Sequence, residues 1–199
     1  YHEGYVLQQT FSGPNLNTSL VFRESLKDSV LWERVAEMQR LLLGQPKGPL
    51  SALRHREEIY ALLQEVDAWP CDIGILEWAG RVAETVCCSN EARQFWEKLL
   101  TLGDHPHARL GLARLALQEQ DLARAAIHLN VLRDRFPGKV EGWVLRGIFC
   151  IQEQRYAEAR VAFTRALSLD EHDRKARLGL SLALMGLKEW SLAWEMCEK

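Results

Sequence analysis

Apolar side chains recur through the second half of the chain at the spacing of an α-helix. In residues 156–169 they step by three and four positions, at Tyr156, Ala159, Ala162, Phe163 and Ala166. This step matches the helical period of 3.6 and places the five side chains on one face. Residues 140–153 carry a second apolar pattern, and Gln154 and Arg155 separate the two segments. The pattern predicts two helices, over 140–153 and 156–169, joined by a tight turn.

The same arrangement repeats every 34 residues. The segment from Ala108 to Ala113 recurs from Ala176 to Ser181, which is two periods further along the chain. Four columns keep the spacing: Ala113, Gly147 and Ser181; Ala125, Ala159 and Ala193; Leu122, Tyr156 and Trp190; Leu129, Phe163 and Cys197. Small side chains allow two antiparallel helices to approach closely, so we expect Gly147 to meet Ala159, with Phe163 beside them. A period of this length predicts a stack of helical hairpins.

In these residues the sequence resembles the tetratricopeptide repeat family. The signature positions are filled in the middle copy by Trp143, Gly147, Tyr156, Ala159, Phe163 and Ala166, in the first by Ala113, Ala125 and Pro137, and in the third by Ser181, Trp190 and Ala193. The chain departs from the signature where Arg109 and Arg177 replace Trp and Glu171 replaces Pro. The resemblance implies an all-α fold, a right-handed α-solenoid of antiparallel helix pairs.

Upstream of residue 106 the register fades. At a 34-residue spacing Cys88 takes the bulky column, Phe95 the Phe column and Glu91 the small column, next to Ala92. We expect the following organisation: an extended N-terminal segment or the remnant of a preceding domain at 1–26, an irregular helical cap at 27–71, a degenerate repeat at 72–105, regular repeats at 106–139 and 140–173, and a truncated repeat at 174–199. The chain begins with Tyr1 and not with Met, so we expect it to be part of a longer protein.

The resemblance also implies a candidate binding surface, because the first helices of successive pairs line a concave groove in this family. The residues that the register assigns to the groove are all apolar except Arg114. They are Ile73, Leu76, Leu110, Arg114, Leu117, Val144, Ile148, Ile151, Leu178, Leu182 and Met185. Family members that clamp a C-terminal carboxylate place Lys and Asn where Leu110 and Arg114 stand here, which argues against such a clamp.

Three explanations for an apolar groove remain open. The groove residues pack against an internal segment or neighbouring helices, they bind an extended or helical apolar ligand, or they mediate self-association. Residues 5–22 are a candidate internal occupant, because Tyr5, Leu7, Phe11, Leu20 and Phe22 suit an apolar face.

Charge and hydropathy narrow the range of partners. Residues 1–105 carry 10 Lys and Arg against 15 Asp and Glu, and residues 106–199 carry 15 against 12. Neither half has the basic excess that binding to phosphates requires, so we expect no nucleic-acid partner. The longest apolar stretch, around residues 178–187, has about half of the ~20 residues that a membrane-spanning helix needs. We therefore expect no membrane insertion.

The sequence shows no pattern of catalytic or metal-binding residues. No G-x-S-x-G, H-E-x-x-H or glycine-rich phosphate loop is present. His105 and His107 lack a third metal ligand, and the five cysteines contain no C-x-x-C pair. An odd number of irregularly spaced cysteines is typical of a reducing cytoplasm. We expect a cytoplasmic protein without enzymatic activity, metal or cofactor.

The resulting interpretation is a scaffold that binds a protein or peptide partner in an apolar concave groove. Two alternatives stay open: a secretion-type chaperone for an extended apolar segment, and a regulatory module of a larger signalling protein or enzyme. Because one fold serves many roles, the fold alone does not choose among them.

Overall fold

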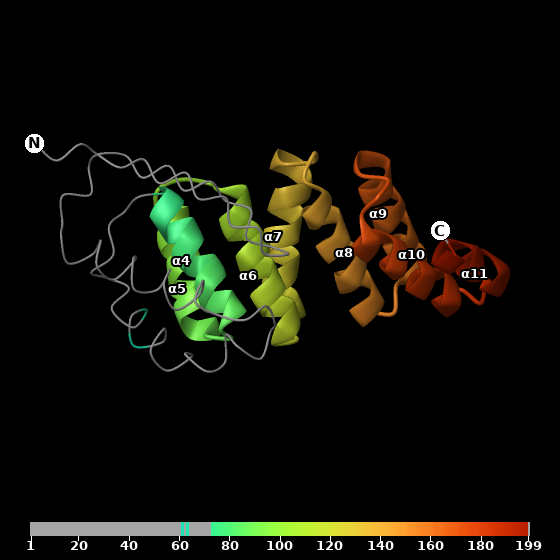
Figure 1. Cartoon of the computed structure of the whole chain (residues 1–199), viewed down its shortest axis with the longest axis horizontal. Helices are drawn as coiled ribbons and strands as arrows, with labels where there is room; N and C mark the ends of the chain where they lie inside the picture. Colours follow the sequence, from blue (N-terminus) through green and yellow to red (C-terminus); the bar gives the residue numbers. More distant parts are fainter. Residues whose placement is uncertain (1–60, 62, 64–72, 199) are drawn as a thin grey trace, which may run out of the picture. The chain divides into compact units, whose positions relative to one another are not determined.

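The computed structural model describes residues 61, 63 and 73–198. These residues form eight α-helices and contain no strand (Figure 1). The expected N-terminal segment 1–26 lies outside the described residues, as does the cap 27–71 apart from residues 61 and 63. The chain divides into two compact units, residues 1–104 and residues 105–199.

The helices pair into hairpins. In each hairpin the first and second helix pack against each other, and the bounds are α4 (Ile73–Thr85) with α5 (Ser89–Thr101), α6 (Pro106–Gln118) with α7 (Leu122–Arg135), α8 (Val140–Gln152) with α9 (Tyr156–Leu169), and α10 (Arg174–Gly186) with α11 (Trp190–Glu198). The second unit holds three of these hairpins, and α8 and α9 lie at the positions that the apolar period predicts. The expectation of an all-α hairpin stack is confirmed.

One backbone conformation ends the first helix of every hairpin. Cys87, Gln120, Gln154 and Lys188 have left-handed backbone angles, with φ between 59° and 64°. In the α8–α9 turn the Arg155 amide donates to the Cys150 carbonyl at 2.8 Å and the Gln154 amide donates to the Ile151 carbonyl at 2.9 Å. This pair of bonds is a Schellman motif, which normally has glycine at the left-handed position. In these turns a residue with a side chain therefore adopts a left-handed conformation that is costly for every residue type except glycine.

A glycine at this position should stabilise the fold. We expect Gln154→Gly to raise the free energy of unfolding by about 0.5–1 kcal/mol, because glycine adopts positive φ without a steric penalty. Ala157→Gly is the matched control. Ala157 is the second residue of α9, where glycine lowers the helix propensity and costs up to about 1 kcal/mol. Urea denaturation of both variants measures the difference, and a loss of stability with Gln154→Gly would contradict this account of the turn.

The core of the second unit is built around one aromatic ring. Phe163 of α9 is fully buried, and its ring lies against Gly147 of α8 and Gly179 of α10. A Cβ atom on either glycine would overlap the ring, so only glycine allows these helices to approach so closely. Tyr156 packs in the same way against Gly186. The predicted proximity of Gly147 and Phe163 is confirmed, and the same ring also connects the hairpin to the next one.

The first hairpin follows the same plan with a register shifted by one residue. Its left-handed residue, Cys87, precedes the next one, Gln120, by 33 positions instead of 34. Counted from this turn, the small column falls on the buried Ala92 and the Phe column on Trp96, whose ring covers Gly80. The expected assignments of Glu91, Phe95 and Cys88 to the columns were therefore wrong by one position. Cys88 is the residue before α5, and Ser89 takes the bulky column.

Candidate functional site

The candidate site lies on the first helices of the second unit. Helix α8 contacts both α6 and α10, so the three first helices are neighbours as well as partners in their own hairpins. Residues that these helices do not bury between them form their exposed surface.

The expected groove residues on α8 and α10 that are at least partly exposed form what we call the apolar stripe: Ile148, Ile151, Leu178, Leu182 and Met185. Ile151 is partly buried, and the others range from 37% exposed at Ile148 to 61% at Leu178. The three residues of α10 are spaced four and three positions apart, which keeps them on one side of the helix. Large apolar side chains aligned in this way favour contact with another apolar surface.

Four other expected groove residues are buried. Leu110 and Leu117 of α6 pack in a cluster with Leu129 and Leu132 of α7 and with Leu145 of α8. Val144 belongs to the cluster around Phe163, and Leu76 is completely buried in its own unit. The neighbouring helices thus cover these slots, and the expectation that they face outward is corrected. Arg114 of α6 is partly buried.

The shifted register explains why α4 contributes no apolar slots. Counted from Cys87, the positions that correspond to Leu110, Arg114 and Leu117 are Glu77, Arg81 and Glu84. Arg81 pairs with Glu77 at 2.7 Å, and the Glu84 carboxylate accepts a hydrogen bond from Trp96 Nε1 at 2.8 Å. Ile73, assigned to the groove at a 34-residue spacing, is the exposed first residue of α4. The apolar stripe therefore consists of α8 and α10 residues.

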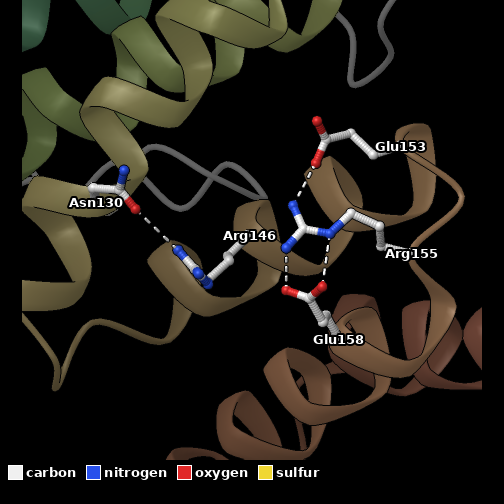
Figure 2. Close-up of polar contacts among 5 residues, drawn as sticks. All are labelled: Asn130, Arg146, Glu153, Arg155 and Glu158. Atoms are coloured by element: carbon white, nitrogen blue, oxygen red, sulfur yellow. Dashed lines mark hydrogen bonds and ion pairs between the residues drawn. The ribbon is translucent and has the colours of Figure 1, made fainter.

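Ion pairs account for most arginines of the second helices and turns in the second unit. Arg155 lies between Glu153 and Glu158 and bonds to both carboxylates (Figure 2). These bonds raise the pKa of Arg155 further above its ordinary value. Other pairs join Arg124 to Asp121 at 3.1 Å, Arg133 to Asp134 at 2.6 Å and Arg160 to Glu189 at 3.0 Å. Arg146 instead reaches the amide oxygen of Asn130 at 3.4 Å (Figure 2).

One histidine has a shifted pKa. His128 of α7 is partly buried, and its Nδ1 lies 3.3 Å from an Nη1 atom of Arg109. Burial, followed by the charge of Arg109, lowers the pKa of His128 from 6.5 because both disfavour the imidazolium. The folded chain thus favours the neutral form of this imidazole more than the unfolded chain does.

Acid should therefore destabilise the second unit through His128. Below pH 6.5 the unfolded chain protonates His128 while the folded chain resists, so the free energy of unfolding falls until the pH passes the lower, folded-state pKa. We expect His128→Gln to remove this part of the pH dependence. Urea denaturation of both proteins between pH 7.5 and pH 5 measures it, and parallel pH profiles would contradict the expectation.

The described residues show no sign of metal or thiol chemistry. They contain no group of three or more His, Cys, Asp or Glu side chains placed to hold a metal ion. Cys150 is a buried thiol whose pKa is raised, mainly by burial, so it remains protonated as a small core residue. Among the helices of this part of the chain, none is both long and apolar enough to cross a membrane.

Solved structures share this architecture. A MamA fragment, 41-end, from Desulfovibrio magneticus superposes with a TM-score of 0.61 at 18% identity, covering 85% of this chain and 92% of that one. A tetratricopeptide repeat protein from Parabacteroides merdae superposes with a TM-score of 0.62 at 18% identity, covering 83% of this chain and 63% of that one. Another MamA structure superposes with a TM-score of 0.60 at 15% identity, covering 73% of this chain and 82% of that one. No curated protein matches the chain in sequence.

Fold and repeat register together define a helical-hairpin solenoid. Two models of the tetratricopeptide repeat match the sequence, one over residues 90–140 and one over residues 140–173. The second match has the bounds of the middle 34-residue copy, which contains α8 and α9. Residues 90–173 of the chain therefore consist of tetratricopeptide repeats.

Proposed function

We propose that this chain is a non-catalytic scaffold that binds a protein or peptide partner along the apolar stripe of α8 and α10. The observation that carries the proposal is the exposure of Leu178, Leu182 and Met185 along one side of a first helix. An ordinary solvated helix face carries polar side chains at such positions. A partner segment that covers the stripe removes this apolar area from water, which favours binding.

The neighbouring charges support a protein segment as the ligand. The exposed Arg174 and Lys175 lie in the first turn of α10, and the exposed Glu141 lies at the corresponding place in α8. These few charges of both signs border the stripe without forming the basic surface that a phosphate backbone requires. The partner that fits is thus an amphipathic peptide segment and not a nucleic acid. We place this interaction in the cytoplasm, because an odd number of irregularly spaced cysteines is typical of a reducing compartment.

Affinity capture from a lysate of the source organism tests the proposal. The baits are the wild type, Ile148→Asp and Val161→Asp, with captured proteins identified by mass spectrometry. Val161 is 65% exposed on the second helix α9, so its variant adds the same charge outside the stripe. We expect wild type and Val161→Asp to capture a protein that Ile148→Asp does not, because an unpaired charge opposes a desolvated contact. Equal capture by all three baits would move the site away from the stripe.

A further inference from the structure

Two charges of opposite sign lie beside the apolar stripe, on neighbouring helices. Glu141 is in the first turn of α8 and Lys175 is in the first turn of α10. The two residues are one period of 34 positions apart, so they occupy the same slot of successive repeats. Both side chains are exposed, and α8 and α10 contact each other. We call Glu141 and Lys175 the rim pair.

The exposure of this side of the first helices is a property of the repeat. Helix α8 has a first helix on each side, α6 and α10, yet Glu141 is exposed. Two turns further along α8, Ile148 is 37% exposed, and Leu182, one period later in α10, is 44% exposed. Residues seven positions apart lie on the same side of a helix. The rim pair therefore borders an apolar slot that neighbouring first helices leave open.

The folded chain does not use the rim pair for its own stability. Within the described part of the chain, neither Glu141 nor Lys175 forms a hydrogen bond or an ion pair. Asp173, the acidic residue nearest to Lys175 in sequence, instead accepts a hydrogen bond from the Ala176 amide at 2.6 Å. A lysine in the first turn also lies at the positive end of the helix dipole, which disfavours a cation. The two charges are thus available to a binding partner.

The rim pair is complementary to itself under two-fold symmetry. A two-fold axis that runs along the first helices, midway between α8 and α10, places α8 of one copy opposite α10 of a second copy. Because the rim pair occupies one slot of the repeat, Glu141 of each copy then faces Lys175 of the other. Ile148 faces Leu182 in the same way. Opposite charges attract in both symmetric contacts, and apolar side chains meet between them.

We propose that a second copy of this chain covers the apolar stripe, in a symmetric dimer whose register is set by the rim pair. The exposed Arg174, beside Lys175, gives Glu141 of the other copy a second cation. This inference rests on the proposed function, because the dimer and a partner protein use the same stripe and compete for it. Dimer formation thus regulates the site: only the separated chain binds the partner, whose apparent affinity falls as the dimer forms.

Charge reversal with rescue tests the dimer, and sedimentation of the full chain measures its dissociation constant. We expect Lys175→Glu and Glu141→Lys each to weaken the dimer at least about tenfold, because each puts like charges in both symmetric contacts. The double variant restores opposite charges and should return to within about threefold of the wild type. Arg165→Glu, exposed on the second helix α9, is the matched control and should leave the dimer unchanged. All these positions are exposed, so the variants should keep the circular dichroism of the wild type.

The outcomes separate this inference from the proposed function. A chain that stays monomeric up to about 0.1 mM, far above a micromolar dissociation constant, would overturn the inference and leave the stripe to a separate protein or to another segment of the chain. A dimer that resists both single charge reversals, that the double variant fails to restore, or that Leu182→Asp leaves intact would overturn it too. In each of these cases, capture of a protein by the wild type and not by Ile148→Asp would still support the proposed function. Charge rescue without any captured protein would support the dimer and contradict a separate partner.

Discussion

Phe163→Ala should lower the free energy of unfolding of the second unit by about 3–5 kcal/mol, the usual range for removing a buried phenylalanine. The ring is completely buried between Gly147 and Gly179, on helices of two successive hairpins. Because each glycine lacks a side chain, nothing nearby fills the cavity that alanine leaves. The variant thus weakens the packing of α9 against α8 and α10 at once. Thermal and urea denaturation measure the change.

A double-mutant cycle tests whether the ring and the glycine act as a pair. Gly147→Ala places a methyl group in the space of the ring and should cost about 1–3 kcal/mol by overpacking. In the Phe163→Leu background the same change should cost clearly less, because the shorter side chain leaves room for the methyl group. Val161→Ala, on the exposed side of α9, should change stability by no more than about 0.5 kcal/mol. Strict additivity of the two core changes would contradict the packing described.

The double variant Leu178→Asp/Leu182→Asp should reduce the affinity for the captured partner by a factor of at least about 100. The two side chains are exposed neighbours on α10, so they are available to the partner and dispensable for the core. Each aspartate replaces an apolar contact with a carboxylate that loses its water on binding, and one buried apolar contact alone is worth about 1.5–3 kcal/mol. Isothermal titration calorimetry with the purified partner measures the loss.

The control for this variant is a folded protein of equal charge. Val161→Asp/Ile127→Asp changes two exposed apolar residues of the second helices α9 and α7. It should bind the partner within about twofold of the wild type. If both double variants lose affinity equally, net charge and not the apolar stripe determines binding.

The period of 34 was sufficient to predict the hairpins of the second unit and the position of Phe163 in its core. The same period misplaced the residues of α4 and α5, because a single missing residue between Cys87 and Gln120 shifts every slot upstream. One feature of the sequence indicates this shift. The buried column of Ala125, Ala159 and Ala193 needs a small residue, and Ala92 meets this need where Glu91 does not. At this position the size and polarity of the side chain, and not the fixed spacing, indicate the correct register.

Exposure was harder to predict than helix position. Leu110, Val144 and Leu178 occupy the same slot in successive repeats, yet the first two are buried and the third is 61% exposed. The exposure differs because different helices pack on either side of each of these leucine or valine side chains. The repeat register does not give this information. Trp190 shares a repeat column with Leu122 and Tyr156, yet its side chain is largely exposed. The sequence does not reveal the left-handed turn residues, because Gln and Lys carry no signal for positive φ.

Site-specific photo-crosslinking most directly tests the claim that a partner covers the apolar stripe. A photoreactive phenylalanine analogue replaces Leu182 in one protein and Val161 in a second, and each is irradiated with the captured partner. The account predicts a crosslink from position 182 and none from position 161, with the crosslinked partner peptide rich in apolar residues. A crosslink from position 161 but not from 182, while the partner remains bound, would contradict the central claim.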